Sequence, residues 1–340
     1  MKSADSTRCP SRLWDLSLIL CIACMFQVTV MIHASDSKIQ LIRTQDASVD
    51  VLVGSKLLTS YHFGLGLHKP IFHPLKAPNG KSVTRGFPME FGIPGEHTDH
   101  WHHEGVSFTY GDVDGIDFWA KYGPRGDNPG SGKIRHTGFT RIESGEVGRL
   151  TSTADWITPV GKVVLRQEAD FTFRAESDWQ AIDLSFVLTA QKEKVTFRDT
   201  KEGMMALRLA SQLREDKSGR YLNAAGKEAE AGVWGKRSAW VALRGTINGE
   251  GVTVALINHP ESAGYPTYWH ARGYGLFSAN PFGRKDFEKG SVPLNFSLEP
   301  GRSANFRYRI LVHSGKLTLQ EMERQFQNYV ETSSKSHEQK

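Results

Sequence analysis

Alternating apolar and polar positions, the pattern of a half-buried β-strand, recur through most of this chain. The clearest runs are residues 164–173 and 182–188, and in the second every other residue from Ile182 to Leu188 is apolar. Similar shorter runs occupy residues 39–43, 49–53, 57–63, 106–110, 195–199, 204–213, 240–244, 252–258 and 304–312. Many strands with long polar loops between them predict an all-β fold built as a large antiparallel β-sandwich.

One amphipathic helix is expected near the C-terminus. Thr318 and Glu321 have the spacing of a capping box, and four apolar side chains follow at helical spacing: Leu319, Met322, Phe326 and Tyr329. This stripe predicts packing against the core. Because no repeat or linker divides the chain, residues 35–330 are predicted to form one domain, with residues 331–340 as a polar tail.

The first 34 residues have the layout of a secretory signal peptide. Three basic residues precede an apolar run from Leu16 to Ile32, and Ala34 offers a small residue at a cleavage point. We therefore expect a signal peptide over residues 1–34 and a secreted or periplasmic protein. An uncleaved membrane anchor and a lipoprotein attached at Cys24 are the alternatives.

Composition narrows the chemistry of the mature chain. All three cysteines (Cys9, Cys21 and Cys24) lie in the leader, so we expect no disulfide, thiolate nucleophile or thiolate metal site beyond it. The formal charge is +5, but the basic residues are scattered, so nucleic acid is not an expected partner. No later segment is apolar enough to cross a membrane, so no membrane partner is expected for the mature form.

The densest chemistry lies in residues 99–105, where three histidines and two carboxylates occupy six consecutive positions. Imidazole titrates near neutrality and serves as acid, base or metal ligand. His100 and His103 are therefore predicted to be catalytic proton carriers. His102 is predicted to bind substrate.

An extended backbone in this stretch would place His100 and His102 on one face and His103 on the other. Such a pair is a possible metal chelate, but a third ligand would be needed. We therefore expect no metal and no cofactor, with a site at His100 and His102 as the alternative. The acidic loop at 111–119 does not have its acids in the register of a calcium-binding EF-hand loop.

Two further segments carry candidate residues. Glu202 precedes a glycine at a predicted strand entrance, and residues 268–275 combine a histidine and an arginine with aromatic rings. Flat rings beside polar donors are typical of sugar-binding clefts. We predict catalytic roles for Glu202 and His270 and substrate contacts from four other residues, Lys69, Arg85, Trp269 and Arg272.

Several enzyme classes lack their signatures here. The chain contains no nucleophile elbow of the Gly-x-Ser-x-Gly type, no phosphate-binding loop and no dinucleotide-binding glycine pattern. These absences argue against serine hydrolases of that type, nucleotide-dependent enzymes and dinucleotide-dependent dehydrogenases.

As a set, several motifs resemble a bacterial family labelled methane oxygenase PmoA-like. The matching segments include residues 83–85, 99–103, 111–115, 117–119, 202–203, 269–272 and 280–283. The resemblance implies a sandwich similar to that of galactose mutarotases, and it adds Trp119 and Asn280 as expected substrate contacts. Methane oxidation is not carried over, because the mature chain lacks the apolar spans of a membrane oxygenase subunit.

Three functions follow as hypotheses. The first is a secreted carbohydrate-active enzyme, a hydrolase, lyase or epimerase that uses histidine and glutamate as acid and base. The second is a glycan-binding protein without catalysis. The third is a metal-dependent oxygenase, as the family label suggests. The first two hypotheses expect a carbohydrate or another polar small molecule as the partner. The substrate of the oxygenase is left open.

Overall fold

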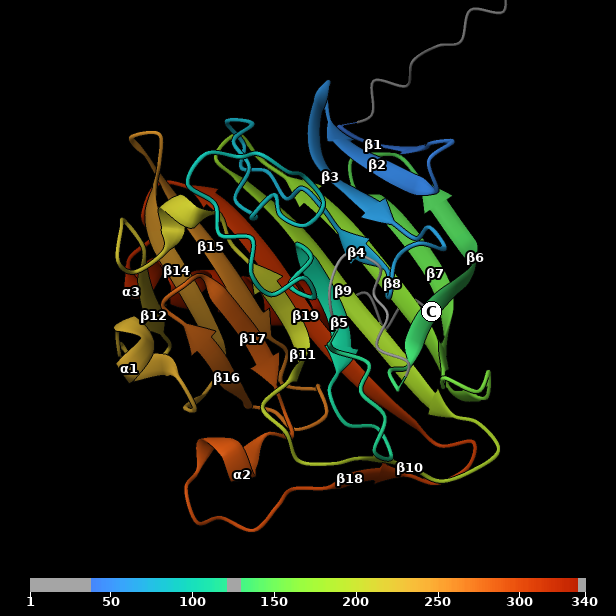
Figure 1. Ribbon diagram of the computed structural model, residues 1–340. Helices are drawn as coiled ribbons and strands as arrows, with labels where there is room; N and C mark the ends of the chain where they lie inside the picture. Colours follow the sequence, from blue (N-terminus) through green and yellow to red (C-terminus); the bar gives the residue numbers. More distant parts are fainter. Residues whose placement is uncertain (1–37, 121–129, 336–340) are drawn as a thin grey trace, which may run out of the picture. The chain divides into compact units, whose positions relative to one another are not determined.

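The computed structural model describes residues 38–120 and 130–335, and this part of the chain is dominated by antiparallel strands (Figure 1). The strands form two large sheets and one small one. The prediction of an all-β sandwich with a C-terminal helix is confirmed. The expected signal peptide lies outside the described residues.

The first sheet has nine strands. In spatial order they are β1 (Ile39–Arg43), β2 (Ser48–Val53), β3 (Lys56–His62), β4 (Ile71–Phe72), β5 (Val106–Tyr110), β11 (Gly203–Arg208), β17 (Leu276–Asn280), β16 (Thr267–Arg272) and β13 (Arg237–Ser238). The strands β16 and β17 were not predicted, because aromatic and polar residues interrupt the apolar alternation there.

The second sheet has eight strands. In spatial order they are β12 (Arg220–Asn223), β14 (Trp240–Ile247), β15 (Glu250–Asn258), β19 (Ser303–Ser314), β9 (Trp179–Ala190), β8 (Val163–Ala175), β7 (Gly148–Ile157) and β6 (Lys133–Glu143). A two-stranded sheet pairs β10 (Val195–Phe197) with β18 (Phe296–Leu298). The short helices are η1 (Ser211–Leu213), α1 (Ala229–Val233) and α2 (Arg284–Phe287).

The main core lies between the two large sheets. Phe108 on β5 stacks on Phe186 on β9 with ring centroids 3.9 Å apart. The register of four neighbouring strands directs one set of side chains into this core: Phe108, Met205, Ala279 and Trp269. Burial of these side chains is the main stabilising contribution expected for a domain with no disulfide.

The opposite face of the same four strands carries small and polar side chains. Ser107, Ala206, Ser278 and His270 lie next to one another across β5, β11, β17 and β16. All four are buried although they point away from the main core. Loops therefore cover this face, and small side chains leave room for them.

The helix α3 (Leu319–Lys335) packs on the other sheet. Met322, Phe326 and Tyr329 form a second apolar cluster with Trp240 and Leu311. The predicted capping box is present, since Thr318 N donates to Glu321 Oε2 at 2.7 Å and Glu321 N donates to Thr318 Oγ1 at 3.3 Å. Residues 331–335 continue the helix, so the polar segment expected from residue 331 begins within α3.

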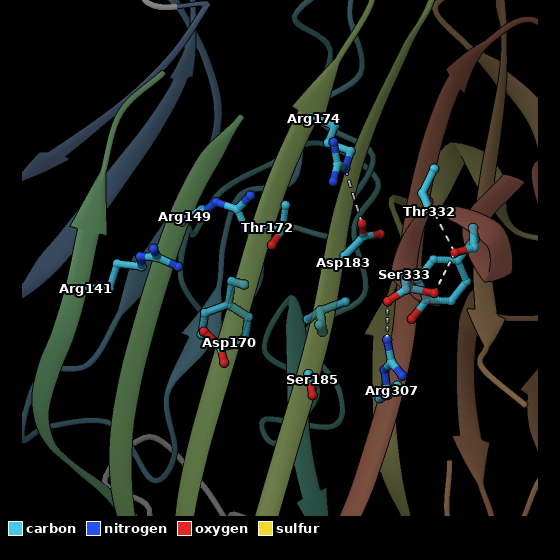
Figure 2. Close-up of a pocket in the computed structure, with 13 residues that line it drawn as sticks. Arg141, Arg149, Asp170, Thr172, Arg174, Asp183, Ser185, Arg307, Thr332 and Ser333 are labelled. Carbon is cyan, nitrogen blue, oxygen red and sulfur yellow. Dashed lines mark hydrogen bonds and ion pairs between the residues drawn. The ribbon is translucent and has the colours of Figure 1, made fainter. Parts of the chain in front are cut away.

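A groove with arginines along it lies on the outer face of the eight-stranded sheet beside α3 (Figure 2). Most of its charged side chains are paired within the sheet. Asp183 receives two hydrogen bonds from Arg309, at 2.5 and 2.9 Å, and also pairs with Arg174. None of the residues predicted for the active site lines this groove, and among the described residues no helix is long and apolar enough to cross a membrane.

Candidate functional site

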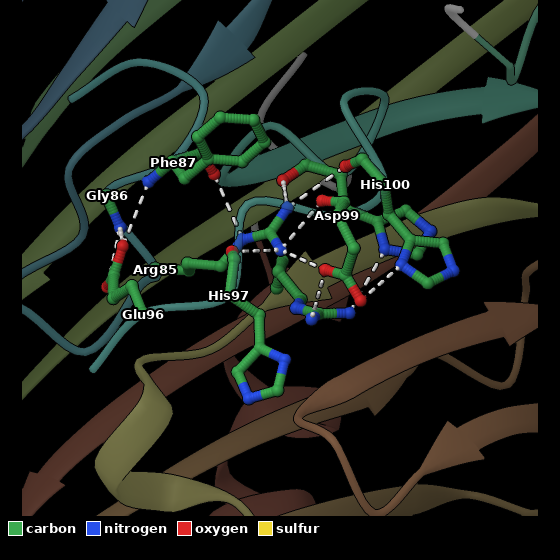
Figure 3. A network of polar contacts seen from close by, with 9 residues as sticks. Arg85, Gly86, Phe87, Glu96, His97, Asp99 and His100 are labelled. Atoms are coloured by element: carbon green, nitrogen blue, oxygen red, sulfur yellow. Dashed lines mark hydrogen bonds and ion pairs between the residues drawn. The ribbon is translucent and has the colours of Figure 1, made fainter. Parts of the chain in front are cut away.

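The histidine-rich segment is a loop held in place by Arg85 (Figure 3). The Arg85 guanidinium is almost fully buried and donates to the backbone carbonyls of Phe87, His97, Asp99 and His100 at 3.0–3.2 Å, and to His103 O at 3.4 Å. It also pairs with Asp99 Oδ1 at 2.8 Å. Five carbonyls and one carboxylate around a single cation fix the path of the loop.

The segment is a turn, so the separation of faces that an extended backbone would give does not apply. His103 N donates to His100 O at 3.0 Å, and His100 has a φ of 48°, in the left-handed region. The turn brings the rings of His100 and His103 into parallel stacking at 4.8 Å. The ring of His102 lies 4.2 Å from that of His103. The three imidazoles therefore form one cluster instead of facing two sides.

The proton of His100 is positioned by Asp99. His100 Nδ1 lies 2.9 Å from Asp99 Oδ2, and the ionised carboxylate can only accept a hydrogen bond. Arg208, His100 and Arg85 hold the pKa of Asp99 below its usual value, although burial opposes them. Neutral His100 therefore carries its proton on Nδ1 and has a free lone pair on Nε2. The His100 side chain is 40% exposed, so an incoming molecule can reach it.

His103 has the opposite arrangement. Arg208 Nη1 lies 3.2 Å from His103 Nδ1, and arginine can only donate, so this nitrogen accepts. Burial, with positive charge nearby, lowers the pKa of His103 well below its usual value, so the ring is neutral near pH 7. Its proton then sits on Nε2. His103 is therefore a hydrogen-bond donor at Nε2. The sequence predicted it to carry a proton in catalysis but did not say whether it would donate or accept one.

Tyr274 joins the cluster and was not singled out from the sequence. Its ring stacks on His100 at 5.4 Å, and the Arg208 guanidinium carbon lies 4.4 Å from the ring centre. Burial raises the pKa of Tyr274, so its hydroxyl stays protonated. Charges on Asp99 and Glu202 also act on it, which places it between the two predicted clusters. Its position in the aromatic segment 268–275 was the available signal.

Trp119 closes the cluster from another side. Its ring lies 5.9 Å from that of His103 and packs on Ala206 of the nine-stranded sheet. Asp117 Oδ1 accepts hydrogen bonds from the backbone N–H of Trp119 at 2.7 Å and of Ala120 at 3.0 Å, which holds this segment. The buried Trp119 Nε1 has no hydrogen-bond partner within the described residues. This location fits the predicted substrate contact.

Glu202 and His270 form a second pair on the same sheet face. His270 Nδ1 lies 3.8 Å from Glu202 Oε2 and 3.1 Å from Lys201 O, to which it donates. Burial lowers the pKa of His270, so the ring is neutral with a lone pair on Nε2. Glu202 also pairs with Lys201 at 2.8 Å. The structure therefore brings the segments near residues 100, 202 and 270 to one face.

Two predicted substrate contacts are not accessible. Lys69 is buried and its ammonium lies 3.4 Å from Glu104 Oε2 and 3.2 Å from His102 O. Arg85 is saturated by the loop that it holds. Both cations position the histidine turn, and their contact with substrate stays a prediction. Sequence position alone does not separate a buried cation from an exposed one.

Two more predicted contacts are structural. Trp269 points into the main core, and its Nε1 donates to Ser238 O at 3.0 Å. Asn280 is fully buried and donates to Thr200 O at 2.8 Å, which fixes the segment before Glu202. Arg272 is different, because it is partly exposed and lies 6.0 Å from the centre of the Tyr274 ring while pairing with Glu230. Arg272 remains a candidate substrate contact.

A separate Ser–His–Glu arrangement does not have the geometry of a nucleophile. Ser333 Oγ lies 2.8 Å from His259 Nε2, but His259 Nδ1 accepts a hydrogen bond from Glu261 N at 3.1 Å. Neutral His259 therefore carries its proton on Nε2 and cannot take one from Ser333. The contact anchors the end of α3.

The described residues contain no group of three or more histidine, cysteine or acidic side chains arranged to hold a metal ion. His100 Nδ1 is engaged by Asp99, and His102 is held in the ring cluster. The alternative of a metal at His100 and His102 lacks its third ligand within the described chain.

Comparison with solved structures finds carbohydrate-active enzymes at low similarity. The galactosidase domain of an alpha-galactosidase-sucrose kinase has 10% identity and a TM-score of 0.39, and the match covers 82% of this chain and 41% of that one. A putative aldose 1-epimerase from Escherichia coli K12 has 12% identity and a TM-score of 0.30, covering 81% of this chain and 99% of the other. A galactose mutarotase related enzyme from Lactobacillus acidophilus has 11% identity and a TM-score of 0.29, covering 82% and 98%.

Similarity at this level carries no argument about activity, and no curated protein sequence matches the chain. The family model that matches is described as a family of unknown function, DUF6807, and it covers residues 48–327. The resemblance to a methane oxygenase PmoA-like family is therefore corrected. The chain belongs to the family of unknown function DUF6807.

Proposed function

We propose that this protein is a carbohydrate-active enzyme that works by moving protons on its substrate, as epimerases and lyases do. The observation that carries the proposal is the Asp99–His100 pair facing Tyr274. His100 offers a free lone pair on Nε2, and the ring of Tyr274, whose hydroxyl stays protonated, stacks on the His100 ring. A positioned base next to a positioned acid is the arrangement that general acid–base catalysis requires.

The sequence analysis also named hydrolases, and the carboxylates of the site argue against that enzyme class. Glycoside hydrolysis ordinarily uses two carboxyl groups on either side of the scissile bond. Here Glu104 is buried against Lys69, and Asp99 serves two arginines and His100. Asp117 accepts from two backbone N–H groups. Glu202 is the carboxylate least committed to structure, and a single one does not make the usual pair.

The surroundings support a sugar as substrate. The rings of Trp119 and Tyr274 lie against the histidine cluster, and the buried Trp119 Nε1 is a donor without a partner among the described residues, a combination of aromatic rings and polar donors that suits a sugar. On this proposal Glu202 and His270 act at the other end of the bound sugar, with neutral His270 accepting a proton. Secretion, expected from the leader, suits a protein that meets extracellular glycans.

The test is a panel of mono- and oligosaccharides incubated with purified protein and analysed for epimerised or cleaved product. We expect His100→Ala to lower turnover by about 10²–10⁴-fold, the usual contribution of a general base. His97→Ala, which removes an exposed imidazole three residues away, should retain activity. Unchanged turnover in His100→Ala would remove that residue from the mechanism.

A glycan-binding protein without catalysis remains the second candidate, because the same rings and donors would bind a sugar. It predicts calorimetric binding with no product from any ligand on the panel. The oxygenase hypothesis depended on the family label, which the family comparison does not support.

A further inference from the structure

The two most deeply buried arginines of the candidate site, Arg85 and Arg208, pair with the same carboxylate. Lys69 pairs with Glu104, Lys201 with Glu202, and Arg272 with Glu230. The remaining two cations, Arg85 and Arg208, share a single carboxylate, Asp99. Glu96 also acts on Arg85, whereas Asp99 is the carboxylate that pairs with Arg208 among the described residues.

Arg208 is the less satisfied of the two arginines. Arg85 donates to five carbonyls as well as to Asp99, whereas Arg208 donates to two side-chain atoms among residues 38–120 and 130–335, His103 Nδ1 at 3.2 Å and Asp99 Oδ1 at 3.3 Å. Its Nε is buried and has no partner within the described residues. Burial, with Arg85 nearby, lowers the pKa of Arg208 to about 10, while Asp99 acts in the opposite direction.

The groups around Arg208 add donors and no negative charge. His103 is neutral with its proton on Nε2, and Tyr274 keeps its hydroxyl proton. Trp119 Nε1 is a second buried donor without a partner. Burial lowers the pKa of His102 to about 3, so this ring is neutral as well. Arg208 Nε and Trp119 Nε1 are thus two buried donors without a partner among the described residues, and such donors fit an anionic ligand.

We propose that the sugar recognised at this site is a uronic acid, whose carboxylate is held by Arg208 with His103 and Trp119 as further donors. The inference rests on the proposed function, since it names the substrate class of the same site. Arginine suits a carboxylate because its planar guanidinium can donate two parallel hydrogen bonds.

A carboxylate at Arg208 also gives His100 a reaction. The hydrogen on C5 of a uronate is α to the carboxylate, and a nearby cation stabilises the charge that forms when it leaves. His100 Nε2 takes the C5 proton, the electron pair forms a C4=C5 double bond, and the C4–O bond breaks. The departing oxygen takes a proton from the Tyr274 hydroxyl, and His100 later returns its proton to Tyr274 through solvent. No oxidant or metal takes part in this sequence.

The first experiment varies the ligand and leaves the protein intact. Oligogalacturonate and oligoglucuronate are compared by calorimetry with the same oligosaccharides reduced to neutral sugars. We expect the acidic forms to bind roughly 10- to 100-fold tighter, the effect of a hydrogen bond to a charged group. Equal affinity for acidic and neutral forms overturns the uronate inference while leaving the proposed function standing. Binding of no sugar at all overturns both.

The second experiment follows the chemistry. Wild-type protein with oligouronate should produce the ultraviolet absorbance of a conjugated double bond, or exchange the C5 hydrogen in heavy water if the step ends in epimerisation. If a uronate binds and gives neither signal, the proposed reaction is overturned. Arg208→Gln should lose the preference for acidic over neutral ligands, whereas Arg214→Gln, on an ion pair with the exposed Asp216, should keep it. If the folded Arg208→Gln protein keeps its preference for acidic ligands, another cation binds the carboxylate and the assignment to Arg208 is wrong.

Discussion

The two stacked histidines of the site differ in where the proton sits, and their neighbours decide it. His100 faces a carboxylate and must donate through Nδ1, whereas His103 faces a guanidinium and must accept there. Two identical side chains, 4.8 Å apart, therefore present opposite chemistry to a ligand. His100 is suited to take a proton and His103 to donate a hydrogen bond.

At this scale the first prediction is for Asp99→Asn. An asparagine can present its NH₂ group to His100 Nδ1, which favours the tautomer with the proton on Nε2 and removes the base. We expect kcat to fall by about 10²–10⁴-fold with less change in ligand affinity. Asp216→Asn, which alters a carboxylate that is 60% exposed, is the matched control. Full activity in Asp99→Asn would show that the pair does not set the tautomer.

A second prediction concerns stability against pH. Burial lowers the pKa of His68 from 6.5 to about 4, so the unfolded chain binds a proton more readily than the folded one between these values. Stability is therefore complete above pH 6.5 and falls as the pH falls toward 4, by about 3 kcal/mol from this residue. Urea unfolding at pH 7 and pH 4 measures it. His68→Gln should reduce the difference, and His97→Gln, an exposed control, should leave it unchanged.

Among the elements, the turn that carries the histidines depends on one buried cation. The loop has an aromatic contact of its own between Phe87 and Trp101, and the Arg85 guanidinium supplies hydrogen-bond donors to carbonyls that no strand satisfies. His100 adopts a left-handed backbone conformation within it. Such conformations persist where surrounding contacts impose them, and they cluster at functional sites.

The prediction at this scale is for Arg85→Met. Removing one member of a buried charged network leaves five carbonyls without their donor and takes one of two arginines from Asp99, which costs about 3–5 kcal/mol. The free energy of unfolding should fall by that amount, and proteolysis should cut residues 86–104 first. Arg166→Met, on an exposed ion pair with Asp155, should change stability by about 1 kcal/mol or less. Equal losses in both variants would contradict the role given to Arg85.

At the scale of the whole described structure, the strand order of the nine-stranded sheet brings the residues of the site together. The strands β5, β11, β17 and β16 are neighbours although their residues come from three separate regions of the chain. Arg208 on β11 then reaches Asp99 and His103, and the turn after β16 brings Tyr274 against His100. The other sheet supports this arrangement through the core and is itself covered by α3.

The prediction at this scale tests whether α3 is part of the stable fold. Met322 is fully buried between the helix and the eight-stranded sheet, so Met322→Ala should destabilise the protein by about 2–5 kcal/mol. Asn328→Ala on the exposed side of the same helix is the control. The affinity for sugar should not change in either variant, because the helix lies on the other sheet. Loss of binding in folded Met322→Ala would contradict this separation.

The sequence by itself determined the fold class, most strands and the C-terminal helix, because side-chain periodicity is a local property that burial enforces on each element. It also located the histidine segment and the regions of Glu202 and His270. It did not separate Lys69 and Arg85, which are buried supports, from accessible ligands, nor assign Trp269 to the core. Tertiary structure decided these points, and it placed Tyr274 and Arg208 at the site, because burial and proton position depend on neighbours distant along the chain.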